Sequence, residues 1–125
     1  MRERARECCE YCLLPQSSQE ATFHIDHILP RVVGGATVED NLALACVSCS
    51  LRKGARTHSM DSDIPVRIFD PRTNDWNKHF ILTDDFLIIG LTATGRATVQ
   101  MLAMNRPAIV AIRKELDFFK RYPPF

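Results

Sequence analysis

Two Cys-x-x-Cys pairs constrain the fold of this 125-residue chain more than any other feature. The first pair is Cys9 and Cys12, and the second is Cys46 and Cys49. This spacing lets both thiolates of a pair face one ion, and two such pairs supply the four ligands of a structural zinc site. Cys8 could replace Cys9, but the tighter spacing to Cys12 favours Cys9. We therefore expect Zn²⁺ to join the start of the chain to the second pair.

The overall composition is that of an ordinary folded protein. Hydrophobic residues make up 46%, charged residues 25%, and the formal net charge is +1, so binding to a polyanion would depend on where the cations lie. No apolar run approaches the ~20 residues that span a bilayer. The charged start of the chain lacks the apolar stretch of a signal peptide. We therefore expect a cytoplasmic protein, in which cysteines bind metal more often than they form disulfides.

Between the two cysteine pairs, the sequence predicts a strand, a turn and a short helix. Residues 22–29 alternate polar and apolar side chains, as a half-buried strand does. The two glycines at 34–35 mark a turn. Residues 37–42 predict a turn or a single helical turn, and residues 50–56 can form a short helix after the second pair.

The remainder of the chain predicts a small sheet and two helices. We expect strands at 66–69, 79–82 and 86–91, with residues 58–65 as a linker or an exposed loop.

Thr94 would cap the first of the two helices, over residues 95–104, and Pro107 would open the second. Apolar residues recur at helical spacing in the second helix and predict a buried stripe of Ile109, Ile112, Leu116 and Phe119.

Residues 8–56 resemble the HNH endonuclease family at several independent spacings. The matching motifs are Cys9-x-x-Cys12, His24-x-Asp26-His27-x-x-Pro30, Gly34-Gly35, Asn41-Leu42 and Cys46-x-x-Cys49-x-x-x-Lys53-Gly54. The later sequence is also similar to the tail of a bacterial subgroup of small HNH proteins, in Phe69-Asp70-Pro71-Arg72, Trp76, His79-Phe80 and Gly90-Leu91-Thr92-x-Thr94-Gly95-Arg96-Ala97-Thr98. The resemblance implies an α+β fold, with a zinc-stapled ββα-metal module over 1–58 and a C-terminal extension over 59–125 packed on the same domain.

The resemblance also implies a metal-dependent endonuclease that hydrolyses phosphodiester bonds, with DNA as the expected substrate. The sequence shows no base-reading helix, so we expect little sequence specificity. The family's general base falls on His27, and a histidine with its usual pKa of ~6.5 suits removal of a proton from water. Asp26 falls on a ligand position for a catalytic divalent cation, Mg²⁺ or Mn²⁺/Ni²⁺, which carboxylate oxygen binds well. Asn41 falls on the middle asparagine of the family motif, which ties the loop to the two-stranded ribbon of the module and so orients the histidine.

Ser50 departs from the family pattern, because the family usually carries Asn or His there as the second metal ligand. A hydroxyl can offer an oxygen, but its side chain is shorter. His24 would share a strand face with Asp26 and could compensate as an auxiliary ligand. Ser50 could equally be a helix N-cap.

Arg52, Lys53 and Arg56 follow the second cysteine pair and are candidate phosphate contacts. Such a cluster can equally be a solvated face.

An alternative function is a degenerate HNH module that binds nucleic acid or a protein partner without cleavage. Ser50 and the small net charge favour this alternative, whereas the intact Asp26, His27 and Asn41 favour the enzyme. A double-strand cut by one small domain would need two copies. The partners to consider besides nucleic acid are therefore a second copy of the chain and another protein, and not a membrane.

Overall fold

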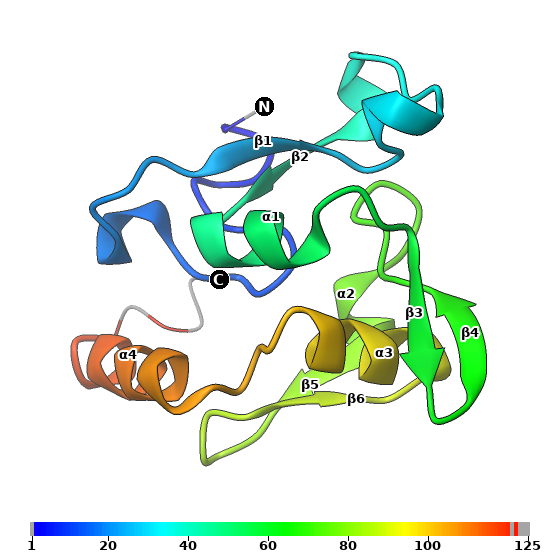
Figure 1. Ribbon diagram of the computed structural model, residues 1–125. Helices are drawn as coiled ribbons and strands as arrows, with labels where there is room; N and C mark the ends of the chain where they lie inside the picture. Colours follow the sequence, from blue (N-terminus) through cyan, green and yellow to red (C-terminus); the bar gives the residue numbers. More distant parts are fainter. Residues whose placement is uncertain (1, 121, 123–125) are drawn as a thin grey trace.

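A computed structural model describes residues 2–120 and 122, which form an α+β fold (Figure 1). The strands pair into two-stranded antiparallel sheets, and short turns of 3-10 helix lie at Gln16–Ser18, Arg31–Val33 and Glu39–Asn41. In chain order the other elements are β1 (His24–His27), β2 (Leu42–Ala45), α1 (Val47–Lys53), β3 (His58–Asp61), β4 (Ile64–Arg67), α2 (Trp76–His79), β5 (Phe80–Leu82), β6 (Ile88–Gly90), α3 (Ala93–Met101) and α4 (Pro107–Phe118).

The strands β1 and β2 and the helix α1 form the ββα unit in the upper half of Figure 1. His24 pairs with Ala45, and His27 pairs with Leu42. The strand predicted over 22–29 is shorter, because side chains bind the backbone on either side of it. Gln16 Oε1 accepts the Phe23 N–H at 2.7 Å before the strand, and loop contacts described below hold the chain after it.

The helix α1 begins before the predicted residue 50. Cys46 precedes the helix, and its sulfur accepts the Cys49 N–H at 3.4 Å, so the thiol group caps the first turn. Ser50 lies inside the helix and is not its N-cap. Gly54 ends the helix with a φ of 54°, a conformation that glycine adopts easily.

Residues 58–65, predicted as a linker or loop, instead form β3 and the start of β4. Ser62 adopts a φ of 56° in the turn between the two strands. The hairpin packs against α3, where Arg96 Nε and Nη2 donate to the Asp61 carboxylate at 3.0 and 2.9 Å. A polar strand that pairs and packs in this way has no strong hydrophobic alternation, so its sequence resembles a loop.

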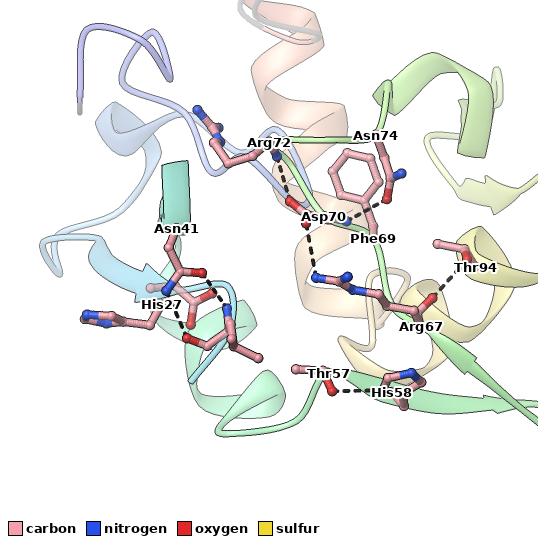
Figure 2. Close-up of polar contacts among 12 residues, drawn as sticks. His27, Asn41, Thr57, His58, Arg67, Phe69, Asp70, Arg72, Asn74 and Thr94 are labelled. Carbon is pink, nitrogen blue, oxygen red and sulfur yellow. Dashed lines mark hydrogen bonds and ion pairs between the residues drawn. The ribbon is translucent and has the colours of Figure 1, made fainter. Parts of the chain in front are cut away.

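The predicted strands β5 and β6 are confirmed with narrower bounds, because residues 76–79 form the short helix α2. The helix α3 begins before the predicted residue 95. Thr92, not Thr94, caps it by accepting the Gly95 N–H at 3.0 Å. The Thr94 hydroxyl instead donates to the Arg67 carbonyl at 2.9 Å (Figure 2).

Two glycines let α3 approach β6 and the end of α2 closely. A Cβ on Gly90 would lie 2.3 Å from the Arg96 nitrogen, and one on Gly95 would lie 2.1 Å from the His79 carbonyl oxygen. Only glycine fits at these positions, and this explains structurally why the tail motif contains Gly90 and Gly95.

The helix α4 begins at Pro107, as predicted. Ile109 and Leu116 are buried and Ile112 is half-buried, but Phe119 is 62% exposed, so the predicted stripe is wrong at its last residue. Phe119 is the C-cap residue, just after the last residue of the helix. Arg113, on the same helix, is also buried and donates to the backbone carbonyls of Phe86 and Met104.

One hydrophobic core joins the ββα unit to the C-terminal elements, including Tyr11, Leu44, Phe69, Phe80 and Leu102. The Trp76 indole donates to the Tyr11 carbonyl at 2.8 Å, and the Tyr122 hydroxyl donates to the Cys12 carbonyl at 3.1 Å. Within the described chain, no helix is long and apolar enough to cross a membrane.

The loop at residues 70–74 also connects the C-terminal elements to the cysteine-bearing start of the chain (Figure 2). The buried Asp70 carboxylate accepts the Arg72 backbone N–H at 2.8 Å and the Arg67 guanidinium at 3.2 Å. Arg72 in turn forms an ion pair with Glu10, which lies between Cys9 and Cys12, and Glu10 accepts the Leu44 N–H at 3.0 Å. The tail motif therefore supports the cysteine-bearing turn.

Candidate active site

The four predicted cysteines form one cluster. Their sulfur atoms lie within 4.8 Å of one another, and all four residues are buried: Cys9, Cys12, Cys46 and Cys49. Cys8 lies outside the cluster, and its thiol donates to the Arg6 carbonyl at 3.3 Å. The four-cysteine cluster therefore contains Cys9 and not Cys8.

The electrostatics of the cluster fit a bound cation. Burial raises the pKa of the Cys9 thiol well above its usual value, and the hydrogen bond to Cys12 raises the pKa of Cys49. The hydrogen bond to Cys12 lowers the pKa of Cys46. Without a cation to balance the charge, the four buried thiols cannot all ionise, so the pKa of one falls while those of its neighbours rise. A closed set of four sulfur ligands is the set that structural Zn²⁺ prefers.

The loop that leaves β1 is fixed by the side chain of Asn41 (Figure 2). Asn41 Oδ1 accepts the Leu29 N–H at 2.8 Å, and Nδ2 donates to the carbonyls of Leu29 at 3.0 Å and Ala36 at 2.9 Å. Gly35 packs so closely that a Cβ there would lie 1.7 Å from the Leu29 carbonyl oxygen. The loop is therefore tied to the end of the strand that carries His27.

His27 is the last residue of β1 and is half-buried. Its Nε2 lies 2.9 Å from Thr37 Oγ1, and its backbone carbonyl accepts the Lys53 ammonium at 3.0 Å. The strand, the loop and α1 thus all contact this residue.

Asp26 is held in a buried ion pair. Its exposed fraction is 8%, and that of Lys53 is 1%. Lys53 Nζ lies 3.2 Å from Asp26 Oδ2, and the Tyr11 hydroxyl donates to the same oxygen at 2.8 Å. Burial, followed by the Asp26 charge, raises the pKa of Tyr11 well above its usual value, so the phenol stays protonated as a donor.

The contacts of Tyr11 and Lys53 with Asp26 were not predicted from the sequence. Each residue belongs to a motif, since Tyr11 lies inside the first cysteine pair and Lys53 precedes Gly54. The motifs gave no sign that both side chains converge on Asp26.

His24 and Ser50 are brought together across the ββα unit. His24 Nδ1 lies 2.9 Å from Ser50 Oγ, with His24 exposed on β1 and Ser50 half-buried on α1.

The side chains proposed for chemistry share one cleft of about 520 Å³. Its lining includes His24, Asp26, His27, Arg31, Val32 and Ser50. The cleft lies between β1 and the N-terminal part of the following loop on one side and the end of α1 on the other.

The three predicted phosphate contacts differ in exposure. Arg52 and Arg56 are exposed. Both also donate hydrogen bonds to α1: Arg52 to Ser48 Oγ at 3.2 Å, and Arg56 to the carbonyls of Arg52 and Lys53. The Lys53 ammonium is enclosed with Asp26 and does not face a surface.

A β-ribbon, a helix and four clustered cysteines, with an Asp-His pair on the first strand, define a small class of metal-binding ββα domains. Comparison with protein families shows that residues 9–56 match the HNH endonuclease family, and this part of the chain is therefore an HNH family domain. Comparison with curated proteins and with solved structures gave no match. A match to this family over residues 9–56 points to nuclease activity on nucleic acid.

Proposed function

We propose that this protein is a metal-dependent endonuclease that hydrolyses phosphodiester bonds, with DNA as the expected substrate. One observation carries the proposal. Asp26, His27 and the His24–Ser50 pair all line the same open cleft, next to a loop that Asn41 fixes to β1.

In this proposal His27 is the general base that removes a proton from the attacking water. Its backbone is held by β1 and by Lys53, and the adjacent loop is held by Asn41. A base that is fixed beside an open cleft can meet water and substrate without a change of fold. Asn41 acts indirectly, by keeping the loop in place.

Asp26, Ser50 and the auxiliary His24 would hold a catalytic divalent cation. An ionised carboxylate has about four lone-pair sites, so the bonds from Tyr11 and Lys53 do not use all of them, and Asp26 lines the cleft. Carboxylate and hydroxyl oxygens suit Mg²⁺ or Mn²⁺, and the imidazole also suits Ni²⁺. Such a cation supplies stabilisation of charge on the leaving oxygen.

A second ion, Zn²⁺ on the four cysteines, would be structural. Its sulfur ligands are all buried, so no position is open to water or substrate.

Arg52 and Arg56 remain candidate phosphate contacts, since both are exposed near the end of α1. We assign Lys53 instead to the orientation of Asp26, because its ammonium is enclosed. Contacts to phosphate alone would fix the nucleic acid without reading its sequence.

The alternative, an HNH module that binds without cutting, is favoured by two observations. Ser50 occupies the position of a longer ligand, and its hydroxyl contacts His24. Asp26 already binds Lys53 and Tyr11. The variant Ser50→Asn tests this alternative, because a longer ligand should raise cleavage from a low level if the site is catalytic.

The main test is cleavage of supercoiled plasmid with Mg²⁺, Mn²⁺ or Ni²⁺ by the wild type and by His27→Ala. We expect the wild type to nick or linearise the plasmid and the variant to lose roughly 10²-fold or more, the usual contribution of a general base. His58→Ala is the matched control, since His58 is exposed on β3 outside the cleft lining.

Both variants should keep the zinc content and melting temperature of the wild type. Failure of the wild type and of Ser50→Asn with every metal would contradict the endonuclease and leave the binding module. Equal cleavage by wild type and His27→Ala would contradict the assignment of the base.

A further inference from the structure

We infer that Thr37 is a positioning residue for His27, whose hydroxyl fixes which imidazole nitrogen is free to act as the base. This inference rests on the proposed endonuclease function. It adds a residue that lies ten positions along the chain from the histidine, in the loop after β1.

The hydrogen bond is direct. Thr37 Oγ1 lies 2.9 Å from His27 Nε2, so this nitrogen is already hydrogen-bonded to the protein. In the part of the chain that the structure describes, Nδ1 of the same ring has no hydrogen-bond partner. Since His27 lines the cleft, Nδ1 is the nitrogen that can meet a water molecule without displacing Thr37.

The backbone around Thr37 is held by the same contacts that fix the loop. Asn41 Nδ2 donates to the carbonyl of Ala36, the residue before Thr37, at 2.9 Å. The Gly35 N–H donates to the Pro30 carbonyl at 2.9 Å. The hydroxyl is therefore presented by a loop anchored at the end of β1. The side-chain hydrogen bonds of Asn41 go to Leu29 and Ala36, so Asn41 would orient the ring through the position of Thr37.

The direction of this hydrogen bond and the tautomer of the ring depend on each other. A neutral imidazole carries one N–H and one lone pair. If Nε2–H donates to Thr37 Oγ1, the lone pair lies on Nδ1 and can accept a proton. If the hydroxyl donates to Nε2, Nδ1 carries the hydrogen and no nitrogen is free to act as a base. Thr37 is exposed, so its own hydroxyl hydrogen can bond to water while its oxygen accepts from His27.

Three forms of the full chain test this inference: wild type, Thr37→Val and Thr37→Ser. Valine keeps the shape and removes the hydroxyl, whereas serine keeps the hydroxyl. Long-range ¹⁵N–¹H correlation spectra of His27 report its tautomer without any need for activity. We expect the Nε2–H tautomer in wild type and Thr37→Ser, and a mixture of tautomers in Thr37→Val.

Plasmid cleavage supplies the second measurement. Loss of one orienting hydrogen bond should lower kcat by ~10-fold in Thr37→Val with KM changed little, and Thr37→Ser should restore kcat. A wild type with the hydrogen on Nδ1, or a Thr37→Val protein with unchanged tautomer and kcat, would overturn the role of Thr37 while leaving the endonuclease intact. Absence of cleavage by wild type and every variant would overturn both.

Discussion

The cysteine cluster and the cleft lie in the same ββα unit, yet they are built in opposite ways. The cluster takes four ligands of one type from two segments, and all four are buried. The cleft combines nitrogen and oxygen donors whose exposure ranges from exposed His24 to buried Asp26. A closed, uniform ligand set suits stability, whereas an open and mixed set leaves room for water and substrate.

Tyr11 and Asp26 connect the two regions. Tyr11 lies between two cysteine ligands in the sequence and donates its hydroxyl to the carboxylate beside the cleft. The position of Asp26 therefore depends on the fold of the first cysteine pair. This arrangement predicts that damage to the cluster disturbs the cleft, while damage to the exposed side chains of the cleft leaves the cluster intact.

The largest effect is expected when the cluster is broken. Cys49→Ser should lose the bound zinc, and the free energy of unfolding should fall by on the order of 5 kcal/mol or more, because metal binding contributes directly to folding in small sites. Zinc content and circular dichroism on heating measure the two effects. Cys8→Ser is the matched control and should keep one zinc per chain, since Cys8 is buried but lies outside the cluster. A Cys49→Ser protein that holds no metal but melts at the same temperature as the wild type would contradict a structural role of the zinc.

A smaller loss is expected when the buried ion pair of Asp26 with Lys53 is broken. Lys53→Met leaves the Asp26 carboxylate buried without its cation, which should cost about 3–5 kcal/mol in urea unfolding. The double variant Asp26→Asn, Lys53→Met should recover part of that loss, because no unpaired charge remains. The control Arg52→Met changes an exposed cation on the same helix and should stay within ~0.5 kcal/mol. If Lys53→Met and Arg52→Met behave alike, the buried pair does not hold the cleft.

These contrasts also show what the sequence could predict. The two Cys-x-x-Cys spacings identified the cluster and chose Cys9 over Cys8, because ligand spacing is a local constraint. The turn before β2 and the start of α4 at Pro107 were also correct, since each depends on residues adjacent in the chain. The fold class followed from these local signals together with the family motifs.

The misses depended on contacts between distant segments. Thr92 caps α3 and Thr94 does not, because the Thr94 hydroxyl is used by the Arg67 carbonyl. The polar hairpin β3–β4 is held against α3 by the pairing of Asp61 with Arg96. Lys53 is buried because Asp26 lies beneath it, although a lysine near a helix end usually faces solvent.

The smallest predicted effect concerns the pH dependence of Tyr11. Its pKa is raised in the folded state, chiefly by burial and then by the Asp26 charge, so the phenol stays neutral in the folded protein at pH values where the unfolded chain ionises it. The hydrogen bond from Tyr11 should make the wild type more stable than Tyr11→Phe by about 1–3 kcal/mol below pH ~10, because phenylalanine leaves a buried carboxylate oxygen with one donor fewer.

Above pH ~10 the advantage of the wild type should shrink by up to ~1.4 kcal/mol per pH unit, because the unfolded tyrosine releases a proton that the folded one keeps. Urea unfolding of both proteins between pH 8 and 11 measures the difference, and other titrating groups such as Tyr122 cancel in the comparison. A constant difference across this range would mean that the Tyr11 phenol ionises as easily in the folded protein as in the unfolded chain. The link between the cysteine cluster and Asp26 would then not be a buried hydrogen bond.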